Sequence, residues 1–483
     1  MSIHKITPFL SDIKKFFDNS DMTAAMQNIS NILGSVKMTE RNTIAVQSKC
    51  NSVYSLLTVF QCLLMYPLFR IKNVYRAQQG GTLHSLIAAQ KDVFYRFIDN
   101  PNINWRKAMW HISLQLWTKV RVRTDHKANE TCLILDDTDF AKTGRKIEMI
   151  GRVHSHLQHR AILGFKCLCM AITDGISQMV LDFDIVGEKG KKNNYGMSKK
   201  ELSRRKVTMH DSEVLKERVA AYDTSKITLA ISMIRRAISH KVQFKYVLAD
   251  SWFTCQEIIR FIRSRHYKCH WLGMIKVGDK CRTKYKVGKN LYTAPELVKR
   301  GKSLKTKKYS RKLKCHYIIY DAMFAETSVR IFLVRRTNHG QWNGLLTTDT
   351  SLDFIKAWEI YSRRWTLEVV FHEGKSYLGL GKSQSTTFTA QIAATTICCL
   401  QYNILSVAKR FSDYETIGEL FRKVSQETLQ LTVAQQIWGM MQELINAIAE
   451  AFGLTDEDIY DALINRSEQF IHIFECYNLK LAS

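Results

Sequence analysis

Four polar residues of different type stand at fixed offsets in the C-terminal half of the chain: Tyr361, Arg364, Glu368 and Lys375. On one α-helix, at 100° per residue, they fall at about 0°, 300°, 340° and 320°, which is one narrow stripe. A carboxylate held beside a phenol, a guanidinium and an ammonium is either part of a chemical site or part of a solvated face of i,i+3 and i,i+4 charge pairs. Gly374 could end the helix before Lys375 and remove it from the stripe.

Large apolar side chains border this stripe, Ile360 and Phe371 on one side and Trp358 and Trp365 on the other. Such borders predict that the polar groups face inward, where an unpaired charge is costly. The stripe therefore favours a site over a solvated face.

The spacing of the four residues resembles the YREK signature of bacterial insertion-sequence transposases of the DDE type, and none of the four is missing. The resemblance implies that Glu368 is the third acidic metal ligand and that two aspartates lie upstream, each at the end of a strand. It also implies that Tyr361, Arg364 and Lys375 hold DNA phosphates near the cleavage point. The fold it implies is α/β: a ribonuclease H-like catalytic domain with an inserted mainly β subdomain, flanked by N- and C-terminal helical regions.

The first aspartate is expected where the apolar run Thr131–Leu135 ends, because this run predicts a buried strand followed by acids. Strand alternation places Asp137 and Asp139 on one face and Asp136 on the other, which narrows the choice to the first two. In the family the first acid is commonly followed by Thr or Ser, as Asp137 is in this chain. We therefore select Asp137.

The second aspartate is Asp250, at the end of a predicted strand, Phe244–Ala249. Thr254 and Glu257 have the spacing of a capping box that opens the next helix, which would place the carboxylate at the mouth of an α/β sheet. An aspartate that only caps this helix is the alternative. Hydrophobic periodicity predicts three elements between the two aspartates: strands at Ile162–Ile172 and Gln178–Val186 and a helix at Ser225–Ser239.

The interval between Asp250 and Glu368 is too long for a plain connection and predicts an inserted β subdomain. Its predicted strands are Lys268–Ile275, Cys315–Phe324, Val329–Arg335 and Trp342–Thr347. A dense basic run contains Lys307, Lys308 and Arg311, and is either a solvated face or a track for DNA phosphates. Similar transposases stack an aromatic of this insertion on a flipped base; Trp342 is the nearest candidate, and a core position is its alternative.

Charge indicates the class of partner. Lysine and arginine outnumber aspartate and glutamate by 71 to 44, a formal charge of +27 that points to nucleic acid. A membrane surface fits less well, because the basic residues do not collect beside an apolar anchor. The apolar stretches Val53–Phe69 and Ala390–Ala408 are interrupted by polar residues and are expected to be core helices, not membrane spans.

Cysteine and histidine usage indicates the compartment. The twelve cysteines form no CxxC pair, and the start of the chain has no signal-peptide pattern, so we expect reduced thiols in a cytoplasmic, nucleoid-associated bacterial protein. His154, His156 and His159 lack further ligands at zinc spacing, and a basic surface loop explains them as well.

The domain organisation predicted from these patterns has four parts. Residues 1–125 form a helical region suited to binding the element's ends; residues 126–265 and 350–410 form the catalytic domain; residues 266–349 form the β-rich insertion; and residues 411–483 form an acidic helical region suited to dimerisation. The terminal regions match no motif.

The function implied by the resemblance is cut-and-paste transposition, in which the enzyme cleaves double-stranded DNA at terminal inverted repeats and joins it to target DNA, as a homodimer on paired ends. Cleavage by water followed by attack of the freed 3′-hydroxyl requires two divalent ions held by carboxylates, here Asp137, Asp250 and Glu368. Oxygen ligands favour Mg²⁺ or Mn²⁺ over zinc. A metal-dependent nuclease on the same fold and a non-catalytic DNA-binding relic are the alternatives.

Overall fold

The computed structural model of the chain describes residues 29, 31–50, 52–65, 89–122, 131–155, 158–187, 212–264, 269–337, 340–412, 414–426, 447, 451–453 and 455. The chain divides into two compact units: residues 35–64 with 92–413, and residues 1–34 with 65–91 and 414–483. In the second unit, residues 417–426 are helical, and most of the predicted acidic region lies outside the described residues. The candidate site belongs to the first unit.

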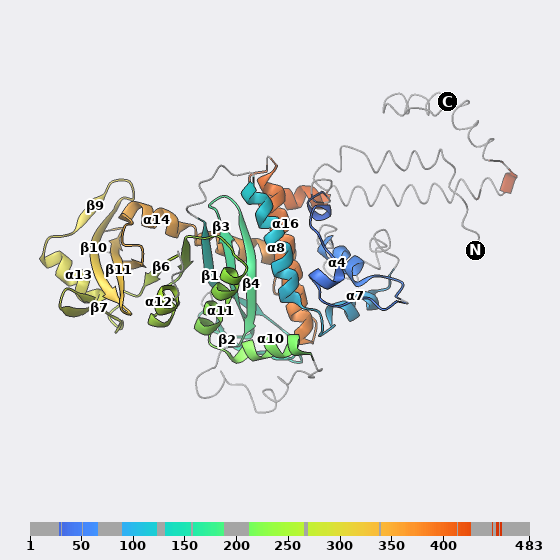
Figure 1. Cartoon of the computed structure of the whole chain (residues 1–483), viewed down its shortest axis with the longest axis horizontal. Helices are drawn as coiled ribbons and strands as arrows, with labels where there is room; N and C mark the ends of the chain where they lie inside the picture. Colours follow the sequence, from blue (N-terminus) through green and yellow to red (C-terminus); the bar gives the residue numbers. More distant parts are fainter. Residues whose placement is uncertain are drawn as a thin grey trace, which may run out of the picture. The chain divides into compact units, whose positions relative to one another are not determined.

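The first unit is organised around a mixed β-sheet (Figure 1), which has twelve strands in the described part of the chain. Its order is β2-β3-β1-β5-β6-β12-β11-β10-β7-β8, with β4 paired to β3 and β9 to β10. The first six strands are β1 (Cys132–Ala141), β2 (Gly151–Ser155), β3 (Arg160–Thr173), β4 (Gln178–Val186), β5 (Tyr246–Ala249) and β6 (His270–Ile275).

Strand directions identify the fold of this half. β3 runs antiparallel to its neighbours β1 and β4, and β5 and β6 then continue the sheet parallel to β1. The predicted α/β, ribonuclease H-like domain is confirmed. β4 has the predicted bounds, but β1 continues past Leu135 to Ala141, because β3 pairs with every one of its residues. The acids Asp136, Asp137 and Asp139 therefore lie within the strand and not beyond its end.

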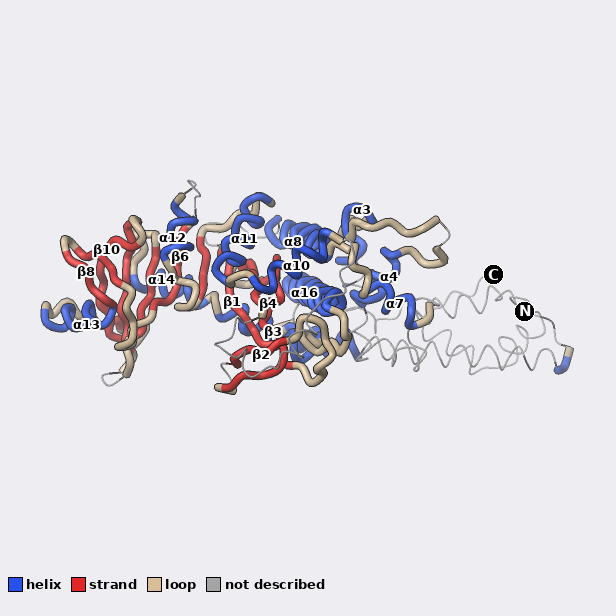
Figure 2. Tube along the Cα trace, turned by 90° about the horizontal axis from the view of Figure 1, so that it is seen from below, coloured by secondary structure: helices blue, strands red, loops and turns tan. Residues whose placement is uncertain are grey.

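The insertion is mainly β, as predicted, but it extends the same sheet. β12 pairs antiparallel with β6, so the strands of the insertion lie on the side of β6 that faces away from β1 (Figure 2). The elements are β7 (Lys284–Val287), β8 (Asn290–Thr293), α13 (Ala294–Ser303), β9 (Lys308–Ser310), β10 (Cys315–Phe324), β11 (Thr327–Arg335) and β12 (Asn343–Thr347). The sequence pattern missed β7, β8, α13 and β9, which are short and contain few apolar residues.

Two long helices, α8 (Trp105–Val122) and α16 (Phe388–Arg410), pack on the sheet. The shorter N-terminal helices are α3 (Glu40–Thr43), which packs on α8, and α4 (Leu56–Met65) and α7 (Lys91–Ile98). α8 and α16 run side by side against β4 (Figure 1). The amide of Asn403 bonds both backbone groups of Val180, at 2.8 Å each, so α16 is fixed to β4 as a neighbouring strand would be.

Helix α16 is long and apolar enough to cross a membrane by composition, and 94% of its most apolar window is buried inside the protein. This agrees with the prediction of a core helix at Ala390–Ala408. For Val53–Phe69 the structure describes α4, and residues 66–69 lie outside the described residues.

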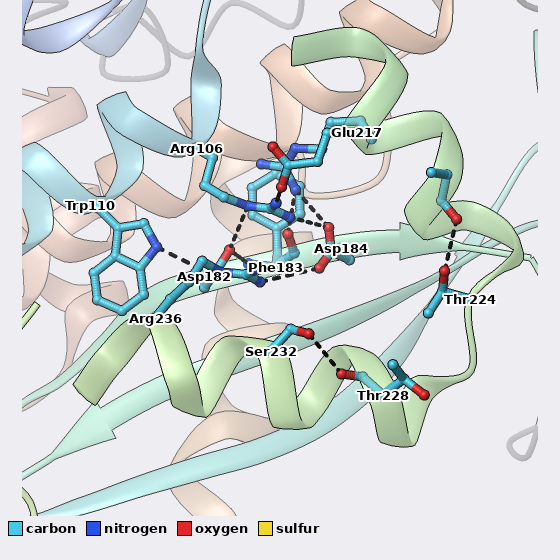
Figure 3. A network of polar contacts seen from close by, with 12 residues as sticks. Arg106, Trp110, Asp182, Phe183, Asp184, Glu217, Thr224, Thr228, Ser232 and Arg236 are labelled. Carbon is cyan, nitrogen blue, oxygen red and sulfur yellow. Dashed lines mark hydrogen bonds and ion pairs between the residues drawn. The ribbon is translucent and has the colours of Figure 1, made fainter. Parts of the chain in front are cut away.

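Three helices are tied to β4 by a buried charge network (Figure 3). Asp182 and Asp184 on β4 meet Arg106 of α8, Arg218 of α10 (Glu213–Asp223) and Arg236 of α11 (Lys226–Ser239). Burial alone would raise the pKa of Asp182, but the three guanidinium groups outweigh it and lower the pKa. Charges buried in this way hold their helices in place, because removing one partner leaves another unpaired.

Candidate active site

The polar stripe lies on two helices and a π-helical turn, and not on the single helix predicted. These elements are α14 (Phe354–Ser362), α15 (Trp365–Glu373) and η5 (Gly374–Leu378). Between α14 and α15 the amide of Arg364 bonds the carbonyl of Tyr361 at 2.9 Å, an i to i+3 contact that tightens the backbone. Gly374 keeps helical dihedral angles, φ −58° and ψ −43°, and begins the π turn that carries Lys375.

The apolar borders of the stripe are only partly buried. Ile360 and Phe371 are buried, as expected, whereas Trp365 is 63% exposed. The predicted inward orientation is therefore wrong for the Trp365 border, and the stripe lies at the rim of the core.

Arg364 joins two acids. One of its terminal nitrogens donates to Asp136 Oδ2 at 2.7 Å, and the other donates to Glu368 Oε1 at 2.5 Å. Its guanidinium carbon lies 6.0 Å from the centre of the Tyr361 ring. The side chain of Asp136 is 17% exposed and that of Glu368 34%, so these charges meet in a partly desolvated place.

Asp250 lies beside Asp136 at the edge between β5 and β1. The two strands are parallel and Leu135 pairs with Ala249, so each aspartate is the next residue along its strand. Burial raises the pKa of the Asp136 carboxyl to about 7, and the charges of Asp137 and Asp250 add to this, although Arg364 opposes it.

Asp137, selected from the sequence as the first acid, points elsewhere. Its Oδ2 is 2.6 Å from Lys226 Nζ and its Oδ1 is 3.5 Å from Lys166 Nζ, and Lys166 also bonds Asp139. The geometry favours Asp136, which shares Arg364 with Glu368. Strand alternation separates Asp136 from Asp137 but does not indicate which face of β1 carries the site, because the apolar part of the strand is buried on both faces.

A sequence signal for Asp136 does exist. In both parallel strands an aspartate is the first polar residue after the apolar run: Asp136 follows Leu135 as Asp250 follows Ala249. The helix after Asp250, α12 (Gln256–Arg263), begins differently from the prediction: Cys255 is its N-cap and makes no side-chain cap bond. The predicted capping box is wrong, because Thr254 Oγ1 instead accepts a bond from the Trp271 indole at 3.2 Å.

A pocket of about 700 Å³ opens beside these acids. Four of the predicted site residues line it, namely Asp250, Trp342, Tyr361 and Arg364. The guanidinium carbon of Arg335 lies over the Trp342 ring, 5.1 Å from its centre. Burial raises the pKa of Tyr361, and the neighbouring Arg364 opposes this rise.

The remaining predicted DNA contacts lie in two places. Lys375 donates to Thr138 Oγ1 on β1 at 2.6 Å, and burial lowers its pKa. The exposed Lys307, Lys308 and Arg311 lie on or beside β9 in the insertion and do not line the pocket.

Metal binding can be judged from the donor set. In the described ranges no three His, Cys, Asp or Glu side chains are arranged to hold a metal ion, and His156 of the histidine group lies outside those ranges. Asp136, Asp250 and Glu368 offer only carboxylate oxygens, and the positive charge beside them is the guanidinium of Arg364. This oxygen set fits a hard divalent cation and does not fit zinc.

Comparison with known proteins identifies the family. A solved structure of a piggyBac transposase synaptic complex with hairpin DNA resembles the chain with a TM-score of 0.43 and 11% identity, over 88% of this chain and 81% of that chain. No curated protein matches the chain. A family model described as the transposase DDE domain matches residues 127–404, which is more than half of the chain and includes the acids and the pocket. The chain therefore belongs to the family of transposases with a DDE domain.

Proposed function

We propose that this transposase cleaves double-stranded DNA at the ends of a mobile element and joins the freed ends to target DNA, with Asp136, Asp250 and Glu368 as its catalytic acids. The observation that carries this proposal is the position of Arg364. Its guanidinium bonds Asp136, which is 228 residues away in the sequence, and Glu368, which is 4 residues away. It also lines the pocket together with Asp250. Two acids thus meet at one guanidinium, and that guanidinium lines the pocket beside the third acid.

The acids would hold two Mg²⁺ or Mn²⁺ ions, which when bound activate the attacking water or 3′-hydroxyl and stabilise the leaving oxygen. The chain's own residues supply the remaining charge. Arg364 offers a planar set of donors that matches a phosphate, and Lys375 offers a compact one. Tyr361 lies against Arg364, and its raised pKa keeps the phenol protonated as a hydrogen-bond donor.

Further parts of the chain would bind DNA or a second copy. Trp342 lines the pocket, and Lys307, Lys308 and Arg311 form an exposed basic strand and turn that would follow the backbone. We extend the proposal to residues 1–125 as the region that binds the element's ends and to residues 411–483 as the dimerising region on paired ends. The spacing of the signature favours a bacterial insertion sequence as the element and the cytoplasm as the location.

A nuclease that cuts without joining is the alternative that uses the same acids. A non-catalytic DNA-binding relic would keep the basic charge but would not depend on a divalent ion. Products joined to target DNA separate the first alternative from transposition, and dependence of cleavage on Mg²⁺ separates the second.

The test compares wild type with Glu368→Gln on duplexes that carry the element's terminal repeats, with Mg²⁺ present. Glu359→Gln is the matched control, because Glu359 is a nearby, more exposed glutamate whose partner is Lys312. We expect Glu368→Gln to bind DNA as wild type does and to form neither cleaved nor joined product, and the control to form both. Cleavage by Glu368→Gln at the wild-type rate would refute the assignment.

A further inference from the structure

An exposed tryptophan is built into the turn that carries Asp250. Trp252 is 43% exposed, although it lies two residues from the acid. Its backbone N–H donates to Asp250 Oδ1 at 2.9 Å, so the position of the ring and that of the carboxylate are linked. Trp252 does not line the pocket that Asp250 and Ser251 line, so its ring lies outside that pocket.

The ring is held firmly from two directions. Lys226 Nζ lies 4.4 Å from its centre, and the same ammonium bonds Asp137 at 2.6 Å. The ring of Phe253, which is buried, meets it edge-on at 5.1 Å and 78°. An aromatic surface held in place in this way loses little side-chain entropy when it binds a flat ligand.

The chemistry suited to such a surface is a nucleobase. Base stacking on an aromatic ring tolerates any sequence, and an adjacent ammonium favours the nearby phosphate. Trp342 differs in position, because it lines the pocket and Trp252 does not.

We infer that Trp252 stacks on a base of the DNA strand whose phosphate lies at Asp250, and that Lys226, held by Asp137, positions the ring. This inference rests on the proposed function, because it presumes that DNA reaches Asp250. It assigns Asp137 a structural purpose: the carboxylate holds the lysine that lies against the stacking ring.

The first experiment is a double-mutant cycle with one change in the protein and one in the DNA. Cleavage by wild type, Trp252→Ala and Trp252→Phe is measured on duplexes with one abasic site, moved one nucleotide at a time across the cleavage position. We expect Trp252→Ala to lose about 5- to 150-fold, the range for one stacked base, and Trp252→Phe to recover most of this loss. At one position the abasic site should slow wild type by the same factor as Trp252→Ala slows cleavage of intact DNA. At that position it should not slow Trp252→Ala further. Additive losses at every position would overturn the inference.

The second experiment does not need cleavage. The Glu368→Gln background is combined with Trp252→Ala, and duplexes carry 2-aminopurine at the position found above or, where wild type does not cleave, at each position in turn. We expect Trp252 to change the probe's fluorescence at one position and Trp252→Ala to abolish the change. Tyr292→Ala is the control, because Tyr292 also carries a cation over its ring, Arg300 at 5.2 Å, but lies on β8 at the end of the sheet. A signal that Trp252→Ala leaves unchanged at every position would overturn the inference, whereas lack of wild-type cleavage with an intact signal would count against the proposed function alone.

Discussion

Replacing Asp136 and Asp137 in turn by asparagine should produce opposite effects on stability and activity. The two residues are adjacent on β1 and face opposite sides of the sheet, so each serves as the control for the other. We expect Asp136→Asn to abolish DNA cleavage in a protein at least as stable as wild type. We expect Asp137→Asn to be less stable and to cleave more slowly than wild type, because Lys226 is released, but to retain cleavage under conditions in which it is folded.

The magnitude for Asp136 follows from its pKa. Folding raises that pKa from 3.8 to about 7, so the folded state binds a proton that the unfolded state has already released. Stability from this group is therefore present below about pH 4 and is lost as pH rises to about 7. The difference corresponds to ~4 kcal/mol, most of which applies because the side chain is only 17% exposed. Without divalent ions at pH 7.5, Asp136→Asn should gain up to that amount.

The magnitude for Asp137 follows from its partners. Its carboxylate pairs with Lys226 and with Lys166, whose side chains are 15% and 2% exposed. Removing the charge leaves two ammonium groups in a desolvated place with fewer partners. Breaking such a buried pair costs about 3 kcal/mol or more.

The assay is urea unfolding in EDTA, repeated between pH 4 and 8, together with cleavage of terminal-repeat DNA in Mg²⁺. Wild type should lose stability across this range relative to Asp136→Asn. The reasoning is refuted if Asp137→Asn is as stable as wild type and inactive while Asp136→Asn still cleaves.

Three further predictions concern the scaffold. Lys142 is buried, donates to the carbonyls of Gly381 and Ser383, and has a pKa lowered by burial to about 8. The folded protein therefore loses this proton before the unfolded chain does, and the unfolding free energy of wild type should rise by ~3 kcal/mol between about pH 8 and 10.5. Urea unfolding of Lys142→Met should not show this rise. Gly381→Ala should lower the unfolding free energy by about 2 kcal/mol, because the φ of this residue is +75° and a Cβ would lie 2.6 Å from the ring of Phe140; equal urea midpoints would contradict this. Arg106→Met should cost about 3 kcal/mol because it unbalances the charge network on β4, whereas removal of the half-exposed acid of that network in Glu217→Gln should cost under ~1 kcal/mol by the same measurement.

Much of the catalytic half could be predicted from the sequence, because its strands are apolar runs with clear ends. Gln178–Val186 and Cys315–Phe324 have the predicted bounds, and the helix at Ser225–Ser239 begins where Ser225 accepts a bond from the Thr228 amide. Asp250 and Glu368 are predicted from their local context alone, a strand end and a spaced polar stripe. The strand before Asp250 could be predicted because hydrophobic periodicity is a local property of the sequence.

Three features depended on contacts that are distant in sequence. The choice between Asp136 and Asp137 depends on which face of β1 receives α15, and an apolar run buried on both faces does not indicate this. The break between α14 and α15 is made by i to i+3 bonds, although no glycine or proline interrupts the sequence around Arg364. Lys226 and Trp252 were missed because they meet only when α11 is packed beside the turn after β5.

The continuity of the sheet explains how residues from the insertion reach the acids. A separate subdomain could move relative to the catalytic domain, and a pocket between the two would have a variable shape. Here β12 pairs with β6 through Gly344 and Ile275, and β6 pairs with β5, which ends beside Asp250. Trp342 precedes β12 and lines the pocket with Asp250, so the wall and the acid are joined by two hydrogen-bonded strand pairs. A site that must hold reacting atoms within a fraction of an ångström requires this kind of rigid support, and the insertion supplies it because it continues the catalytic sheet.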